Sequence, residues 1–100
     1  MSEPTREQVD AMAGTTVLEF GAGWCPHCKT ARPLVDAELA RRADVRHIWI
    51  EDGSGKRLGR SFGVKLWPTL VLVRDGQEVA RVVRPRSARE VEGLFARLAA

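Results

Sequence analysis

A pair of cysteines between an apolar run and a helix-like segment constrains this chain more than any other feature. Cys25 and Cys28 are the only two cysteines among its 100 residues. The apolar run of residues 15–21 comes before them, and a segment with helical spacing begins near Pro26. A Cys-x-x-Cys pair at the point where a strand gives way to a helix is the arrangement expected of a redox-active dithiol.

The start of a helix gives the two cysteines different chemistry. Its unpaired N–H groups and partial positive charge stabilise a thiolate, which is the form of cysteine that attacks a disulfide. We therefore expect Cys25, at the exposed first turn, to be the nucleophile. Cys28, nearly one turn deeper, is placed to close a disulfide with Cys25 or to resolve a mixed one. A charged His27 would stabilise the Cys25 thiolate further, and Pro26 suits a first helical turn, where its missing N–H removes no hydrogen bond.

Half of a metal site is the alternative interpretation of the same two cysteines. Tetrahedral zinc needs four ligands, and only His27 and His47 are available to join the thiols. His27 lies within the motif and points poorly for joint ligation. Redox chemistry is therefore favoured, and zinc or a cluster bridging two chains is left as an alternative.

Two motifs resemble those of the thioredoxin superfamily. One is Trp-Cys-Pro-His-Cys-Lys at residues 24–29 followed by Pro33, and the other is Trp-Pro-Thr at residues 67–69, where that family has an apolar residue, a cis-proline and a threonine before a strand. The resemblance covers roughly residues 15–99. It implies an α/β, thioredoxin-like fold and exchange between this dithiol and the disulfides of other proteins.

The resemblance also implies a proton acceptor for Cys28. Glu19 falls on the family's buried acid, which would take and return the Cys28 proton, although an edge-facing or surface residue is the alternative. His47 aligns with the family's lysine near that acid. A Glu19–His47 pair is one expectation for His47, and an unpaired, partly exposed strand residue is the other.

A substrate groove beside Cys25 is the third implication of the resemblance. A cis Trp67–Pro68 bond would turn the backbone there, so that a substrate segment pairs with residue 67 like an added strand. Trp67, in place of a small aliphatic residue, would reshape the groove. Trp24 would offer an apolar platform or simply pack beside the motif. Arg84 falls near the position of the glycine that lines the family's substrate groove. We therefore expect this protein not to bind substrates in the family's general way.

Departures from the common thioredoxin motif bear on the direction of electron flow. Pro26-His27 stands where Gly-Pro is usual and resembles the periplasmic disulfide oxidases of the DsbA type, although this chain is too short for that family's inserted helical domain. The thioredoxin family's first strand is missing or reduced. Because His27 favours the reduced form, we expect a potential between about −270 mV, as for thioredoxin, and about −120 mV, as for DsbA.

Chain length and net charge limit the number of domains, the location and the kinds of partner that the sequence allows. One hundred residues with 44% hydrophobic content predict a single domain, residues 1–100. The N-terminal residues contain no apolar signal-peptide core, and no apolar run reaches the ~18 residues needed to span a membrane, so we expect a cytoplasmic protein. The net charge of +3 is spread along the chain, which disfavours a nucleic-acid site. A monomer is the default expectation.

Hydrophobic periodicity and turn signals predict the order α-β-α-β-α-β-β-α. The predicted helices cover residues 5–13, 26–42, 56–62 and a last segment opened by Ser87, and the predicted strands cover residues 15–21, 45–50, 69–73 and 78–83. The first two strands must be parallel with a right-handed crossover. The last two form an antiparallel hairpin at Asp75-Gly76. With the resemblance, this gives a mixed four-stranded sheet of order 2-1-3-4 flanked by helices.

We therefore expect a thiol–disulfide oxidoreductase that reduces or exchanges protein disulfides. No organic cofactor or metal is required, and an upstream dithiol donor, such as a thioredoxin reductase or the glutathione system, would regenerate the dithiol. A dithiol oxidase and a non-catalytic interaction module with the same fold are the competing hypotheses.

Overall fold

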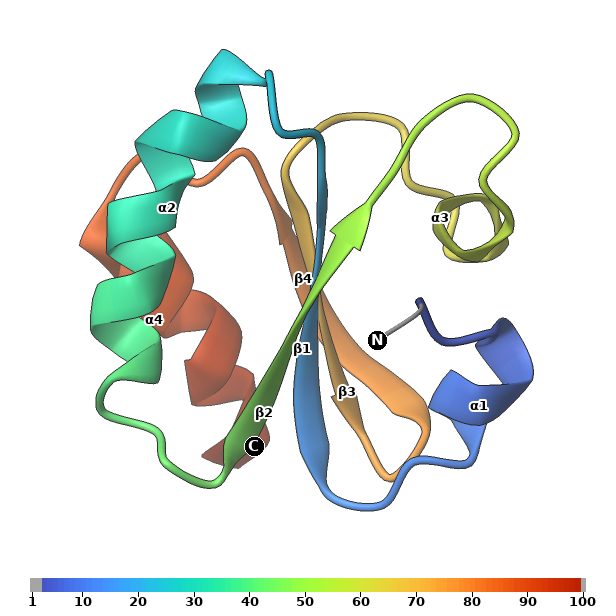
Figure 1. Cartoon of the computed structure of the whole chain (residues 1–100). Coiled ribbons are helices and arrows are strands. Elements are labelled where there is room, and N and C mark those ends of the chain that lie inside the picture. The colour runs from blue at the N-terminus through green and yellow to red at the C-terminus, as the bar shows by residue number, and fades with distance from the viewer. Residues whose placement is uncertain (1–2, 100) are drawn as a thin grey trace.

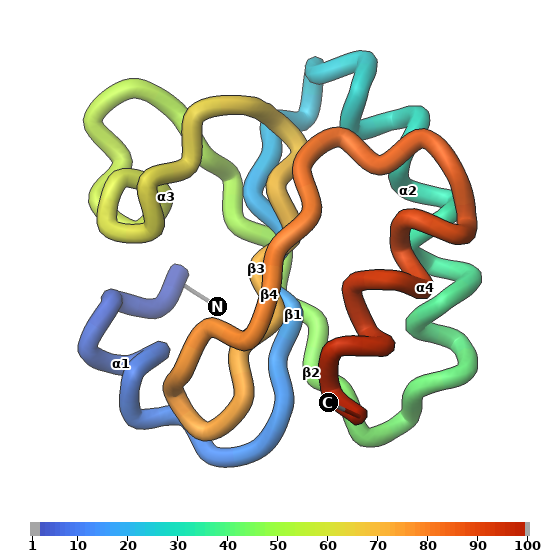
Figure 2. Tube along the Cα trace, turned by 180° about the vertical axis from the view of Figure 1, so that it is seen from behind, coloured from blue at the N-terminus to red at the C-terminus, as the bar shows by residue number. Residues whose placement is uncertain are grey.

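A mixed sheet lies between two layers of helices (Figure 1). The computed structural model describes residues 3–99. The helices are α1 (Arg6–Asp10), α2 (Pro26–Leu39), α3 (Arg57–Ser61) and α4 (Ala88–Ala96), and a 3₁₀ turn covers Arg97–Ala99. The strands are β1 (Thr15–Gly21), β2 (Val45–Glu51), β3 (Thr69–Arg74) and β4 (Gln77–Val83). Helices α2 and α4 cover one face of the sheet, and α1 and α3 cover the other (Figure 2).

The strand order is β2-β1-β3-β4, which confirms the predicted topology. Strand β1 pairs parallel with β2 and antiparallel with β3, and β3 and β4 form the predicted antiparallel hairpin. Because β1 is central and covered on both faces, its residues from 16 to 21 are buried. Successive side chains point to opposite faces of a strand. Glu19 therefore shares the face of Val17, which packs in the core beneath α2 and α4.

Two apolar cores hold the helices onto the sheet. The core beneath α1 and α3 contains Val9, Leu18, Phe20, Ile50, Leu58, Phe62, Val71 and Val73. The core beneath α2 and α4 contains Val17, Ala31, Val35, Leu70, Leu72, Val91, Leu94 and Phe95. The alternation of consecutive β1 and β3 residues between these cores is the period of two expected of a sheet buried on both faces.

Several predicted boundaries are wrong at the ends of helices. The helix expected to reach Arg42 ends at Leu39, because the N–H groups of Arg41 and Arg42 bond carbonyls three residues back and tighten the chain into a turn. Pro33 lies inside α2 without ending it. The first helix ends at Asp10 rather than near residue 13, although its predicted capping box is present.

Two hydrogen bonds join the hairpin turn between β3 and β4 to Gly14, the residue before β1. Asp75 and Gly76 have φ values of 51° and 81°, as a two-residue turn of the primed type requires. Asp75 accepts a hydrogen bond from the Gly14 N–H through Oδ1, at 2.8 Å, and its own N–H donates to the Gly14 carbonyl. A Cβ at Gly76 would overlap the Asp10 carbonyl, so only glycine fits.

The first strand of the described chain is β1, preceded by the short helix α1, which agrees with the expected loss of the family's first strand. Within residues 3–99 no helix is long and apolar enough to cross a membrane.

Candidate active site

The sulfur of Cys25 lies at the start of α2. Cys25 has extended backbone angles, φ −76° and ψ 119°, and its Sγ accepts a hydrogen bond from the Cys28 N–H at 3.3 Å. Pro26 is the first residue of the helix, as predicted. The first N–H groups of a helix have no intrahelical partner and carry its positive partial charge. Cys25 Sγ thus occupies the position where the helix best stabilises an anion.

Cys25 is buried, and the expectation of an exposed sulfur is wrong. Only 3% of the residue is accessible, and Trp67 packs against the small cluster that Cys25 forms with Ala22 and Cys28. Trp24 is 71% exposed and meets Trp67 edge to face, with ring centroids 5.6 Å apart. Trp67 lies 42 positions away in the sequence, so local sequence gives no measure of its contact with Cys25. Both cysteines are free thiols.

Cys28 is buried, and the pKa of its thiol is raised. Burial raises the pKa of the Cys28 thiol to about 11, and the hydrogen bond to Cys25 and the nearby charges of Cys25 and Glu19 act in the same direction. A backbone hydrogen bond from Ala22 opposes the rise only in part. A Cβ at Gly21 would lie 2.7 Å from Cys28 Sγ and 2.6 Å from the ring of Trp49, so glycine is needed for this close approach.

A buried carboxyl and a histidine lie on the same face as Cys28. Glu19 is fully buried, and its Oε1 lies 2.7 Å from Nε2 of His47 on the neighbouring strand. The His47 side chain is 26% exposed. The expected Glu19–His47 pair is therefore present and the unpaired alternative is wrong, although part of the ring is open to solvent.

Arg32 and Trp49 also belong to this region, and the sequence reasoning missed both. Arg32 Nε lies 3.9 Å from Glu19 Oε2, yet neither atom has a hydrogen-bond partner within residues 3–99. The guanidinium carbon lies 4.8 Å from the centre of the Trp49 ring. Arg32 comes four residues after Cys28, which places both on one face of a helix, and Trp49 comes two residues after His47, which places both on one face of a strand. These two spacings in the sequence could have pointed to Arg32 and Trp49 as residues of the site.

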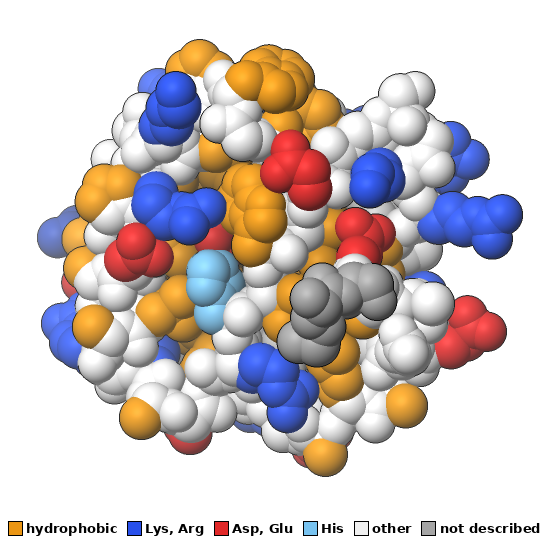
Figure 3. Space-filling view, in the orientation of Figure 1, with side chains coloured by type: hydrophobic (Ala, Val, Ile, Leu, Met, Phe, Trp, Pro, Cys, Tyr) orange, Lys and Arg blue, Asp and Glu red, His pale blue; other side chains and the backbone are white. Residues whose placement is uncertain are grey.

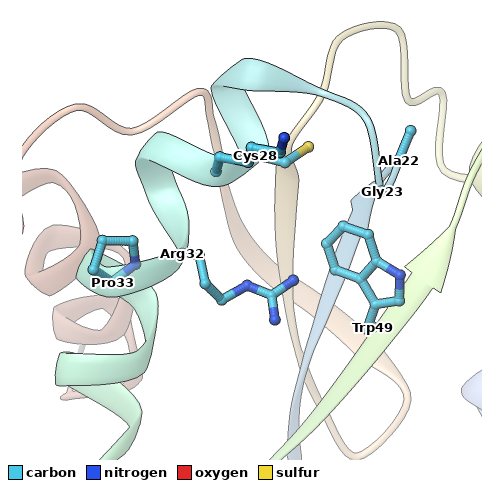
Figure 4. Close-up of a pocket in the computed structure, with 7 residues that line it drawn as sticks. Ala22, Gly23, Cys28, Arg32, Pro33 and Trp49 are labelled. Carbon is cyan, nitrogen blue, oxygen red and sulfur yellow. The ribbon is translucent and has the colours of Figure 1, made fainter.

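A cavity of about 280 Å³ opens beside Cys28 (Figure 4). Its lining residues are Ala22, Gly23, Cys28, Lys29, Arg32, Pro33 and Trp49. The Arg32 guanidinium points from α2 toward the Trp49 indole across this space (Figure 4).

The Trp67 carbonyl joins the dithiol to the end of β4. The Trp67–Pro68 bond is cis, and the Trp67 oxygen lies 3.9 Å from Cys25 Sγ. Arg84 donates from Nε to the same oxygen at 2.8 Å and from its backbone N–H to the Pro68 carbonyl at 2.9 Å. Arg84 has φ 50°, a left-handed conformation that costs a non-glycine residue roughly 1 kcal/mol.

Asp52 is a further residue of the site that the sequence did not reveal. Its Oδ2 accepts a hydrogen bond from Trp67 Nε1 at 2.8 Å, and its N–H donates to the Gly21 carbonyl at 2.7 Å. Asp52 therefore fixes the indole beside Cys25 from the end of β2. In the sequence it lies in a polar loop with no pattern that singles it out.

His27 stands exposed on the first turn of α2. No hydrogen bond or ion pair within residues 3–99 involves its side chain. Nor does this part of the chain bring three or more His, Cys, Asp or Glu residues into a group that would hold a metal ion.

Comparison with known proteins identifies the family. The thioredoxin family model matches residues 2–97. The chain belongs to the thioredoxin family. The superfamily resemblance of the two sequence motifs is thereby confirmed, and the fold agrees with it.

Relatives within the thioredoxin family are moderately similar in sequence. The chain is 35% identical over 77 residues to thioredoxin H2-1 of Oryza sativa subsp. japonica, covering 74% of this chain and 56% of that protein. It is 35% identical over 71 residues to a thioredoxin of Chlamydia muridarum, covering 71% of this chain and 70% of that protein. This chain therefore spans little more than half of the rice thioredoxin.

Solved thioredoxin structures match more of the chain. Thioredoxin 2 of Pseudomonas aeruginosa PAO1 in its reduced form superposes with a TM-score of 0.85 at 50% identity, covering 97% of this chain and 91% of that one. Thioredoxin NaTrxh of Nicotiana alata superposes with a TM-score of 0.76 at 30% identity, covering 91% of this chain and 78% of that one. These relatives support a thiol–disulfide oxidoreductase with Cys25 and Cys28 as its cysteine pair.

The raised pKa of the Cys28 thiol predicts unequal alkylation of the two cysteines. With a pKa of about 11, Cys28 is a thiolate in roughly one molecule in ten thousand at neutral pH. Iodoacetamide should therefore label reduced protein at Cys25 first, and labelling of Cys28 should rise with pH toward about 11. Peptide mass spectrometry of a time course at several pH values measures both rates.

Cys25→Ser is the control, because it reports the rate of Cys28 alone. Equal and slow labelling of both cysteines at neutral pH would contradict the assignment of Cys25 as the reactive thiol.

Proposed function

We propose that this protein reduces disulfides in other proteins. The observation that carries the proposal is the hydrogen bond from the Cys28 N–H to Cys25 Sγ at the first turn of α2, next to a Cys28 thiol that stays protonated. The Cys25 sulfur is thereby prepared to attack a disulfide, and the Cys28 thiol stays protonated until the second exchange. Membership of the thioredoxin family supports the same reaction.

The reaction runs in two exchanges. The Cys25 thiolate attacks one sulfur of a substrate disulfide, the substrate S–S bond breaks, and the second substrate sulfur leaves as a thiolate. Cys28 then loses its proton and attacks Cys25, which releases the first substrate sulfur as a thiolate and leaves a Cys25–Cys28 disulfide. The two electrons that reduce the substrate come from the dithiol.

Glu19 is the proposed acceptor of the Cys28 proton. Its Oε1 is engaged by His47 while Oε2 has no hydrogen-bond partner within residues 3–99, so one oxygen is open to a proton. His47, which is partly exposed, connects the carboxyl to solvent and would pass the proton outward. A buried base beside the thiol matters because Cys28 alone ionises too rarely to resolve the mixed disulfide quickly.

The remaining expectations form part of the same proposal. An external dithiol system, such as a thioredoxin reductase or glutathione, restores the reduced pair. The reaction needs no organic cofactor or metal, and the protein acts as a cytoplasmic monomer in which residues 1–100 form one domain. Trp24 and the Trp67–Pro68 backbone, beside Cys25, would receive the substrate.

The first prediction of this proposal is turnover that depends on Cys25. Wild-type protein should reduce insulin in the presence of dithiothreitol, and Cys25→Ser should fall to the uncatalysed rate because the attacking sulfur is absent. Cys28→Ser should form mixed disulfides with substrate that persist until a reductant is added. Turbidity measures the first, and non-reducing electrophoresis measures the second.

An inactive wild-type protein would favour a non-catalytic interaction module. Oxidation of a reduced peptide that outpaces insulin reduction would favour the dithiol oxidase instead.

A second prediction isolates Glu19. Glu19→Gln should slow resolution of the mixed disulfide by about 10- to 100-fold at neutral pH, because the amide cannot take a proton. The rate in this variant should climb as pH rises toward the Cys28 pKa of about 11, since Cys28 then ionises without a base. Stopped-flow mixing with a chromogenic disulfide separates this step from the first attack.

Glu38→Gln is the matched control. Glu38 is another buried carboxyl, 4% exposed, whose pKa the hydrogen bonds from Arg42 and Arg41 lower against the effect of burial. This change should weaken folding without slowing resolution. Equal slowing by both changes would show that Glu19 acts only through stability.

A third prediction concerns the direction of electron flow. A charged His27 at the helix start favours the thiolate of the reduced form and so makes the disulfide more oxidising. His27→Leu should lower the reduction potential by about 30 mV, which is a tenfold change in the equilibrium constant. Titration against glutathione mixtures measures it.

His27→Arg keeps the positive charge and should keep the wild-type potential. A wild-type potential at or below about −270 mV would show that His27 does not set the redox balance.

A further inference from the structure

Arg84 is a cation without a carboxylate partner, close to the reactive sulfur. Within residues 3–99 no carboxylate oxygen lies within 4.0 Å of its guanidinium nitrogens, whereas Arg81 pairs with Glu78 and Arg42 with Glu38, both at 2.7 Å. Several exposed arginines also have no such partner in this part of the chain. Arg84 differs from them because it is half-buried and held in place.

The Trp67 carbonyl holds this guanidinium beside Cys25. The same oxygen accepts from Arg84 Nε at 2.8 Å and lies 3.9 Å from Cys25 Sγ. A guanidinium has five N–H donors, so one bond to Trp67 orients the group and leaves its terminal nitrogens available. The chain adopts a left-handed backbone conformation at Arg84, where glycine would be unstrained. This side chain is therefore positioned at a conformational cost.

Exposed hydrophobic side chains adjoin the same place. Among the described residues, the large hydrophobic ones that stand exposed are Trp24, Leu66 and Val83, at 71%, 49% and 43%. They precede Cys25, Trp67 and Arg84, respectively, in the sequence. Hydrophobic side chains lie uncovered at the end of the molecule where α2 begins (Figure 3). Exposed apolar surface rimmed by charge is typical of protein-binding sites.

We propose that Arg84 makes this protein select disulfides that carry an acidic residue next to the attacked cysteine. The partner is an extended protein segment with Asp or Glu at that position, and the inference rests on the disulfide reduction proposed above. A carboxylate beside the substrate disulfide would otherwise repel the Cys25 thiolate, since like charges at short range disfavour each other. The Arg84 guanidinium offsets that repulsion and offers two parallel N–H donors to the carboxylate.

Arg84 acts on docking and leaves the sulfur chemistry unchanged. The bond that forms joins Cys25 Sγ to one substrate sulfur, and the bond that breaks is the substrate disulfide. The preference should therefore reside in KM rather than in kcat.

Three matched peptides test the proposal. They are disulfide-bridged and identical except for Glu, Gln or Lys next to the attacked cysteine. Wild-type protein should show kcat/KM about fivefold higher on the Glu peptide than on the Gln peptide at low salt, through a lower KM. Sodium chloride should shrink this ratio in the wild-type protein, because salt screens a partly exposed ion pair.

Substitutions at position 84 should change the order of the peptides. Arg84→Gly, which fits the positive φ, should abolish the preference for the Glu peptide or invert it in favour of the Lys peptide. Arg84→Lys should retain part of the preference, because it keeps the charge without the planar fork. Arg86→Ala is the control: Arg86 is an exposed cation two residues away, and its removal should leave the ratio unchanged. Circular dichroism checks the fold of each variant.

Equal kcat/KM on the Glu and Gln peptides in the wild-type protein would overturn the inference, and so would an unchanged ratio in Arg84→Gly. Failure of the wild-type protein to reduce any of the peptides would overturn the proposed function together with the inference. The salt dependence needs no variant and decides the charge argument even where a substitution impairs folding.

Discussion

The hydrogen bond from the Cys28 N–H to the Cys25 sulfur is the interaction on which the site depends. It exists because an apolar strand ends at Gly21 and a helix begins five residues later with proline at its first position. The helix then points its unpaired N–H groups at one sulfur and carries the other one turn inward. Burial, together with the hydrogen bond to Cys25 and the charges of Cys25 and Glu19, raises the pKa of the second thiol and keeps it protonated. Two identical side chains thereby acquire different environments from their positions on one helical turn.

The sheet register supplies the rest of the site. Because β1 and β2 run parallel, Val17 lies opposite His47 and Glu19 opposite Trp49, so odd-numbered residues of both strands face α2. A carboxyl from β1 and an imidazole and an indole from β2 thus gather beneath Cys28, although 28 residues separate Glu19 from His47. Gly21 ends that row, and its missing side chain makes room for the sulfur and the Trp49 ring. A slip of one residue between the two strands would turn His47 and Trp49 to the face opposite Glu19.

Local patterns in the sequence were enough to predict the helices, the strands and the pair of redox cysteines. The helix start at Pro26, the turn at Asp75-Gly76 and the strands each depend on neighbouring residues, and the structure has them, with errors of one residue at strand ends and up to three at helix ends. The strand order came from the family resemblance. The burial of Cys25 and the bond from Arg84 to Trp67 could not be foreseen, because they join residues 42 and 17 positions apart. Arg32 and Trp49 had signals in their spacing from Cys28 and His47.

The Trp67 carbonyl shows how one backbone atom can couple reactivity to recognition. It lies against the Cys25 sulfur on one side and accepts from Arg84 on the other, while Asp52 fixes the indole of the same residue. A substrate strand that pairs with the Trp67 backbone must share or displace the guanidinium at this oxygen. A carbonyl has two lone pairs, so a substrate N–H and Arg84 can both donate to this oxygen once Cys25 has no thiol proton to donate. The geometry that brings a disulfide within reach of Cys25 therefore also brings its flanking residues within reach of Arg84.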